Sequence, residues 1–197
     1  MRLFVGIPLA PEVLAELTKV VSRLRSNRAN LRWTAPESWH ITLQFLGNAD
    51  QQQYECLVAR LSAVRAAPVP IHLAELGFFH RAGVFFADVA PSPPLVALAA
   101  RVSAATSLCG FSPETRPFHP HIALARARGQ SRGRPDRTIT LPLQALAQPL
   151  QALAHRIGTQ PAFPQFRASE FLLYESHLSP AGSTYEIRHR FPLHESP

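Results

Sequence analysis

Lysine is almost absent from this chain of 197 residues. Lys19 is the only one, so the formal net charge of +7 comes almost entirely from arginine. Arginine suits bidentate contacts with phosphate, but a general arginine bias in the proteins of the source organism would leave the same trace. The charge therefore does not by itself decide for a nucleic-acid partner.

Cysteines and long apolar runs are also scarce. Cys56 and Cys109 each lie in an apolar segment that is typical of a helix. Two such thiols give little support to a disulfide framework or a cysteine metal site, so we expect buried free thiols. No stretch reaches the ~18 uncharged apolar residues of a membrane-spanning helix, and the N-terminal residues lack a cleavage site. We expect a soluble, cytoplasmic, globular protein that does not bind membranes.

Two short stretches in different halves of the chain resemble each other. The letters HITL begin at His40 and the letters HIAL begin at His121. In each stretch the histidine and the residue two places later share one face of a strand, and the isoleucine and leucine share the other. The pattern predicts two strands that each present a polar edge, and two such strands can face each other across a groove.

The paired histidines have a chemical interpretation. Two imidazoles that flank one substrate atom can act as general base and general acid, because both titrate near neutral pH. Thr42 shares a face with His40, and its hydroxyl can donate to an anionic oxygen. A metal pair at His119 and His121 is the alternative, but no cluster of Cys, Asp or Glu in the sequence completes a zinc geometry. We therefore predict a phosphodiester site without metal or cofactor.

The paired motifs resemble the His-x-Thr-x motifs of the two-histidine phosphoesterase superfamily. The bacterial branch, called RNA 2′,3′-cyclic phosphodiesterase or 2′-5′ RNA ligase, is the closer match. Further stretches that are similar to this branch are residues 2–8, 32–33, 45–47, 116–118, 126 and 171–176. The second motif departs from the pattern, since Ala123 stands where the family has Thr or Ser. Residues 128–165 show no family pattern.

The resemblance implies a function and roles for both histidines. It implies hydrolysis of RNA 2′,3′-cyclic phosphate ends to 2′-phosphates, with His40 as proton donor and His121 as proton acceptor. Run in reverse, the same site would join a cyclic phosphate end to a 5′-hydroxyl. A small cyclic nucleotide is an alternative substrate, and an RNA-end binding module with poor turnover is the alternative outside enzymes. We expect a monomer.

Four further residues are candidates for substrate binding. Arg126 lies five places after His121, so regular alternation puts it on the opposite face unless a bulge re-aims it, whereas the resemblance places it near the phosphate. Phe45 lies five places after His40, where a core position is favoured over a base-stacking surface. Tyr174 and Ser176 share a face of a late strand and are groove-lining candidates.

The periodicity predicts an α+β fold with a mostly antiparallel sheet. We expect helices over residues 11–25, 51–65 and 93–108, with a further helix within 141–157. We expect strands over 2–7, 31–34, 39–46, 68–76, 84–89, 170–177 and 184–191 and at the second motif, and an exposed basic loop over 126–137. The resemblance implies a single two-lobed domain over residues 1–197, with pseudo-twofold symmetry, a central groove and helices on the outside.

Overall fold

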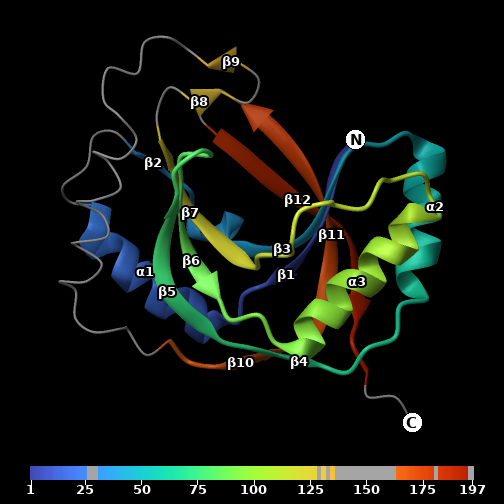
Figure 1. Cartoon of the computed structure of the whole chain (residues 1–197), viewed down its shortest axis with the longest axis horizontal. Coiled ribbons are helices and arrows are strands. Elements are labelled where there is room, and N and C mark those ends of the chain that lie inside the picture. Colours follow the sequence, from blue (N-terminus) through green and yellow to red (C-terminus); the bar gives the residue numbers. More distant parts are fainter. Residues whose placement is uncertain (26–30, 128–129, 132–133, 136–162, 180–181, 195–197) are drawn as a thin grey trace.

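The computed structural model describes residues 1–25, 31–127, 130–131, 134–135, 163–179 and 182–194 (Figure 1). Its helices are α1 (Pro11–Arg25), α2 (Gln51–Ser62) and α3 (Pro93–Ser107), with a short 3-10 turn, η1 (Pro36–Ser38). The longer strands are β1 (Arg2–Pro8), β3 (His40–Asn48), β5 (Leu73–Phe79), β6 (Val84–Val89), β7 (His121–Ala127), β11 (Glu170–Ser179) and β12 (Gly182–Pro192). The shorter ones are β2 (Leu31–Trp33), β4 (Val69–Ile71), β8 (Gln130–Ser131), β9 (Arg134–Pro135) and β10 (Phe166–Ala168).

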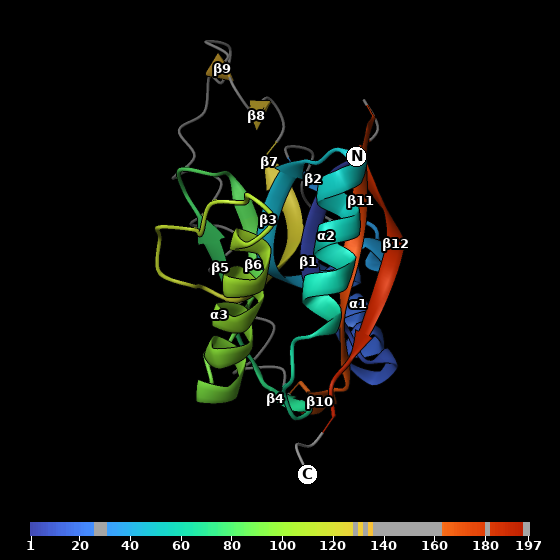
Figure 2. The same cartoon turned by 90° about the vertical axis from the view of Figure 1, so that its right-hand side faces the viewer.

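One antiparallel sheet runs through the molecule in the order β12-β11-β1-β3-β7-β6-β5, and β2 pairs with β7 outside this path. Figure 2 shows the strands following one another from β5 to β12. The two motif strands, β3 and β7, are neighbours at the centre of the sheet. Their ladder is short, and Ile41 and Ile122 are the residues paired across it. The two halves of the sheet therefore meet beside the histidines.

The helices pack on one face of this sheet. Ile41 and Ile122 are fully buried in one cluster with Leu17 of α1, Leu57 of α2 and Leu98 of α3. Burying one such side chain stabilises the fold by roughly 1.5–3 kcal/mol. In both views α2 and α3 lie side by side (Figures 1 and 2). The opposite face carries a smaller cluster of Phe4, Leu172, Tyr174 and Tyr185, and no helix of the described chain contributes to that cluster.

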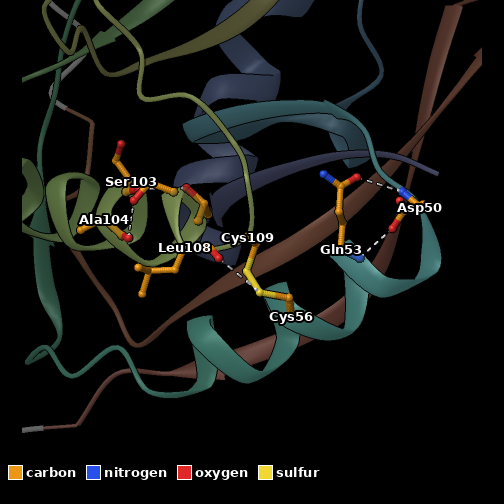
Figure 3. The surroundings of a disulfide bond; sticks show 9 residues. Asp50, Gln53, Cys56, Ser103, Ala104, Leu108 and Cys109 are labelled. Carbon is orange, nitrogen blue, oxygen red and sulfur yellow. Dashed lines mark hydrogen bonds between the residues drawn. A yellow bond between two sulfur atoms is a disulfide. The ribbon is translucent and has the colours of Figure 1, made fainter.

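Local signals in the sequence set the helix ends. Asp50 starts α2 with a capping box: its carboxylate accepts from the Gln53 N–H at 2.8 Å, and the Gln53 side chain accepts from the Asp50 N–H at 3.2 Å (Figure 3). This pair satisfies two backbone donors that the first helical turn leaves open. The helix ends at Ser62, earlier than the expected residue 65. In the described part of the chain, no helix is long and apolar enough to cross a bilayer.

The predicted α+β class with mostly antiparallel strands is confirmed. One predicted strand, over residues 68–76, is wrong in detail, because it is two strands in different sheets. Here β4 pairs with β10 whereas β5 pairs with β6, and Pro70 lacks the N–H needed to pair on both sides. In the basic loop, β8 pairs with β9. The rest of that loop beyond residue 127, and the helix expected within 141–157, lie outside the described residues.

The prediction of free thiols is wrong. Cys56 of α2 and Cys109, just after α3, form a disulfide with a Cα–Cα distance of 5.8 Å (Figure 3). The two residues lie 53 positions apart in the sequence. They meet only because α2 and α3 pack against each other, and this packing cannot be read from two isolated apolar segments. The bridge joins the segments before and after β4, β5 and β6.

We predict that the disulfide contributes measurably to stability. Closing a loop of this length restricts the unfolded chain, so reduction or the Cys56→Ser/Cys109→Ser double substitution should lower the free energy of unfolding by ~2–4 kcal/mol. Urea denaturation of the oxidised, reduced and substituted proteins measures this. Reduction should leave the double variant unchanged, and equal stability of all three forms would contradict the prediction.

Candidate active site

His40 and His121 occupy equivalent places, each being the first residue of a central strand. Because Ile41 pairs with Ile122 in antiparallel register, Ala123 lies beside His40 and Thr42 beside His121. The paired isoleucines are fully buried on the helix side, whereas these four residues are partly exposed on the other side. The register therefore brings both sequence motifs together on the open face of the sheet.

A backbone carbonyl holds each imidazole in the same way. The Nδ1 of His40 lies 2.8 Å from the Ser38 carbonyl oxygen, and the Nδ1 of His121 lies 2.8 Å from the His119 carbonyl oxygen. Because a carbonyl only accepts, both rings must carry hydrogen on Nδ1. Each Nε2 is then the nitrogen left for a ligand, as acceptor when the ring is neutral and as donor when it is protonated.

The turn before His40 is braced through the second motif strand. Ser38 lies in η1, where the Ser38 and Trp39 N–H groups donate to the carbonyls of Ala35 and Pro36. The indole of Trp39 donates to the Thr34 hydroxyl at 2.9 Å, and that hydroxyl lies 2.8 Å from the Leu124 carbonyl of β7. The carbonyl that orients His40 is thus fixed by backbone turns and by a link to the other half of the sheet.

Aromatic rings enclose His40. Its ring centroid lies 4.6 Å from that of Phe4, 5.1 Å from Tyr185 and 5.6 Å from Tyr174. Gly6 of β1 makes room for this arrangement, since a Cβ there would lie 3.3 Å from His40 Cδ2 and 3.0 Å from the Ile41 carbonyl. The absence of a side chain at Gly6 lets the imidazole lie close to the sheet.

Aromatic rings also surround His121, in the other half of the sheet. Its centroid lies 4.9 Å from Phe79 and 5.6 Å from Phe86, and these two phenyl rings stack at 4.0 Å. Phe86 in turn lies over Gly77, where a Cβ would come within 2.5 Å of its ring. Each histidine therefore has apolar rings around it, and a glycine makes room for the close packing: Gly6 beside His40 itself, and Gly77 beneath the Phe86 ring that contacts His121.

These surroundings favour the neutral form of both imidazoles in the free protein. Burial lowers the pKa of His40 to about 4, opposed by the Ser38 carbonyl and assisted by the positive charges of His121 and Arg126. Burial also lowers the pKa of His121; the His119 carbonyl and, to a lesser extent, Asp88 oppose the shift, and the charges of the His119 side chain and Arg126 reinforce it. The charge of Arg126 lowers the pKa of both rings, so this residue lies close to the histidine pair.

A β-bulge explains the position of Arg126. Phe85 pairs with Ala125 but Phe86 pairs with Ala123, so Leu124 is an extra residue on β7. Leu124 and Ala125 are both buried, and alternation resumes with Arg126 on the face of His121. Regular alternation predicts Arg126 on the face opposite His121. That prediction is wrong, because the bulge places Arg126 on the same face as His121.

A second β-bulge lies on β3. Val5 pairs with Gln44 but Gly6 pairs with Thr42, so Leu43 is extra and Phe45 returns to the face of His40. Phe45 is 59% exposed, and its centroid lies 5.9 Å from Phe4. The core position favoured from the sequence is therefore wrong.

The side chain of Gln44 anchors this bulge. Gln44 is buried on the helix side, where its Oε1 accepts from the Thr106 hydroxyl of α3 at 2.7 Å. This contact satisfies a polar group that would otherwise be costly to bury. The bulge that turns Phe45 outward is thus held in place by α3.

The late strand β11 contributes Tyr174 to the surroundings of His40. Tyr174 is buried against Phe4 and His40, and burial raises the pKa of its hydroxyl. Ser176 is partly exposed on the same face of β11, where it pairs with Tyr185 of β12. Sequence reasoning missed Tyr185. Its alternation within the last strand was visible, but nothing in the sequence placed that strand beside His40.

Clusters of possible metal ligands lie elsewhere. In the part of the chain that the structure describes, one group of three could hold an ion, formed by Glu175, His177 and Glu186 of β11 and β12. Arg188 already pairs with Glu175 at 3.4 Å and with Glu186 at 3.2 Å, so a cation would compete with a guanidinium. This group lies on the face of β11 opposite Tyr174 and Ser176. It therefore does not bear on the histidine pair.

Known proteins match this chain in sequence, and solved structures match it in fold. Residues 7–86 match the family described as LigT like Phosphoesterase. An RNA 2′,3′-cyclic phosphodiesterase of Bacillus subtilis is 30% identical over 128 residues, covering 62% of this chain and 69% of that protein. One from Geobacillus stearothermophilus is 28% identical over 98% of this chain, which spans 58% of that relative's length.

A solved structure supports the fold. The crystal structure of Escherichia coli LigT complexed with 3′-AMP matches with a TM-score of 0.73, covering 98% of this chain and 97% of that one. The two sequences are 23% identical, so this likeness concerns the fold. Together with the Bacillus subtilis relative, the match over residues 7–86 and the paired histidine motifs, it leads to one conclusion: the chain belongs to the LigT-like phosphoesterase family.

Proposed function

We propose that this protein hydrolyses RNA 2′,3′-cyclic phosphodiester ends to 2′-phosphomonoesters by acid/base catalysis with two histidines. The observation that carries the proposal is the matched pair of imidazoles. Each is tied through Nδ1 to a carbonyl, and each keeps Nε2 for a ligand on the same open face. The relatives from Bacillus subtilis and Geobacillus stearothermophilus are RNA 2′,3′-cyclic phosphodiesterases, and this supports the substrate class.

The chemistry needs one proton acceptor and one proton donor. His121 Nε2 takes a proton from water as the water oxygen bonds to phosphorus. The bond from phosphorus to the 3′ oxygen breaks, and the Nε2 proton of His40 passes to that oxygen. Each imidazole would supply roughly 10² to 10⁴ in rate. The Thr42 hydroxyl and the Arg126 guanidinium would stabilise the charge on the phosphoryl oxygens, and no metal is required.

The assignment of donor and acceptor follows the family resemblance. In the free protein, burial lowers the pKa of both rings, that of His40 to about 4. A bound phosphodiester adds negative charge between the rings and raises both pKa values.

The nucleoside would lie on the aromatic side of the groove. Phe45 offers an exposed ring beside the Phe4, Tyr174 and Tyr185 cluster, and Ser176 offers a hydroxyl nearby. A base stacked on an aromatic side chain gains ~1–3 kcal/mol. LigT of Escherichia coli was crystallised with 3′-AMP, which supports a nucleotide site in this fold.

Further parts of the proposal concern the chain as a whole. We propose one two-lobed domain, supported by a sheet and a core cluster that both continue through its two halves. We also propose a monomer, and the reverse reaction, 2′-5′ ligation, as a secondary activity. The expected cytoplasmic location stays a prediction, and the Cys56–Cys109 disulfide counts against a strongly reducing compartment.

We predict that the wild-type protein converts a cyclic-phosphate-ended oligonucleotide to the 2′-phosphate, and that His40→Ala and His121→Ala each lose at least ~10²-fold in kcat. Product analysis by phosphorus NMR and chromatography checks both points. A cyclic mononucleotide assayed in parallel separates the RNA substrate from the small-nucleotide alternative.

The control is His189→Ala, a histidine of β12 outside the pair, which should keep wild-type turnover. Activity should also survive exhaustive chelation, because no step passes through a metal. Tight binding of the cyclic end with no turnover by the wild-type protein would instead identify an RNA-end binding module.

We predict that a good leaving group will separate the two roles. A nucleoside phosphodiester that releases p-nitrophenolate needs little protonation of the departing oxygen, so His40→Ala should recover most of the wild-type rate on this substrate. His121→Ala should stay impaired because water still has to lose a proton. The opposite pattern would exchange donor and acceptor.

We predict that Ala123 limits the rate. A hydrogen bond to a charged group is worth ~1.5–3 kcal/mol, so the hydroxyl missing beside His40 costs on the order of 10- to 100-fold. Ala123→Thr should therefore raise kcat/KM, and Thr42→Ala should lower it. Ala123→Val is the matched control, with the same shape and no hydroxyl. Equal rates for the Thr and Val variants would show that position 123 serves packing alone.

A further inference from the structure

The carbonyls that orient the two histidines are fixed by different means. The Ser38 carbonyl lies in a 3-10 turn whose backbone bonds and Trp39–Thr34 contact hold it. His119, by contrast, follows a segment without regular secondary structure between α3 and β7, and its own side chain is exposed. Something other than a regular turn must therefore fix its carbonyl.

The side chain of His119 supplies this restraint. Its Nε2 lies 2.9 Å from Oδ1 of Asp88, a residue of β6 that pairs with His121 across the sheet. Next to it, the Val89 N–H donates to the Pro120 carbonyl at 3.1 Å. Residues 119–121 are thus held to β6 by one side-chain contact and one backbone bond.

Aromatic packing supports the same geometry. The Phe79 ring meets His119 at 5.1 Å and His121 at 4.9 Å, edge to face in both cases. Phe86 meets the same two histidines at 5.8 Å and 5.6 Å. A shift of the His119 ring would therefore disturb the packing around His121 as well as the carbonyl that its Nδ1 contacts.

We propose that Asp88 and His119 form a clasp that positions His121 for catalysis and adjusts its protonation. The inference rests on the proposed function, because it assigns positioning residues to that reaction. Neither residue needs to touch the substrate. The clasp acts through the His119 carbonyl on Nδ1 of His121, and through the charges of Asp88 and His119 on the ring.

The charged and titratable groups around His121 come from four segments. Asp88 lies on β6, His119 on the approach to β7, Arg126 further along β7, and His40 on β3. Asp88 favours the protonated form of His121, whereas His119 and Arg126 disfavour it. Removing the charge of Asp88 and removing that of His119 must therefore shift the titration of His121 in opposite directions.

The test uses Asp88→Asn and His119→Gln, which both keep a side chain able to hydrogen bond. NMR titration of the His121 ring in the free protein should give a lower pKa for Asp88→Asn and a higher pKa for His119→Gln than for wild type. Truncation by Asp88→Ala or His119→Ala should lower kcat by about 10- to 100-fold with little change in KM, because a misplaced catalytic group loses rate more than binding.

The matched control is His177→Gln. His177 and Glu186 form a similar histidine–carboxylate pair at 3.3 Å, on the face of β11 opposite Tyr174. This variant should leave both kcat and the titration of His121 unchanged. Shifts of the His121 titration in the same direction in both isosteric variants, or no loss of kcat on truncation in folded proteins, would overturn the clasp. If the wild-type protein turns over no cyclic phosphate, the proposed function falls, and the NMR titrations still decide whether the clasp adjusts His121.

Discussion

The short pairing of β3 with β7 is the constraint on which the rest of the site depends. Ile41 and Ile122 face each other across this ladder, and both side chains are fully buried. Antiparallel strands paired there must place His40 beside Ala123 and Thr42 beside His121. A one-residue slip of either strand would turn its histidine toward the helices and away from the other. The buried isoleucines therefore fix the register, and the register brings two motifs that are far apart in the chain together on the open face of the sheet.

Bulges extend this arrangement beyond the histidines. A regular strand alternates, so a residue five places after a histidine faces the core. One extra residue on each central strand, Leu43 on β3 and Leu124 on β7, returns Phe45 and Arg126 to the open face. The two halves place different chemistry at this equivalent position, an aromatic ring in one and a guanidinium in the other. The open face of the sheet thus carries an aromatic ring from β3 and a cationic group from β7.

The sequence predicted those features that depend on local pattern. Hydrophobic periodicity located β1, β3, β6, α1 and α3, and the repeated motif identified the histidine pair. Prediction from the sequence failed where the outcome depends on pairing between distant segments. The bulges depend on the register with β1 and β6, the disulfide depends on the packing of α2 on α3, and the contact of Asp88 with His119 depends on the pairing of β6 with β7. No local signal marks any of these, because each is a property of two strands or helices together.

Burial of the imidazoles has a consequence for how the site would work. In water a histidine is partly protonated near neutral pH, but the rings around His40 and His121 favour the neutral form of both. Acid/base catalysis needs one protonated ring, so the protein alone supplies the base more readily than the acid. An anionic ligand between the rings changes this balance, because its charge favours protonation of a neighbouring imidazole. A phosphodiester would therefore help to create the acid that acts on it, whereas a neutral ligand would leave both rings as bases. The same burial that leaves little imidazolium in the free protein thus favours ligands that carry negative charge.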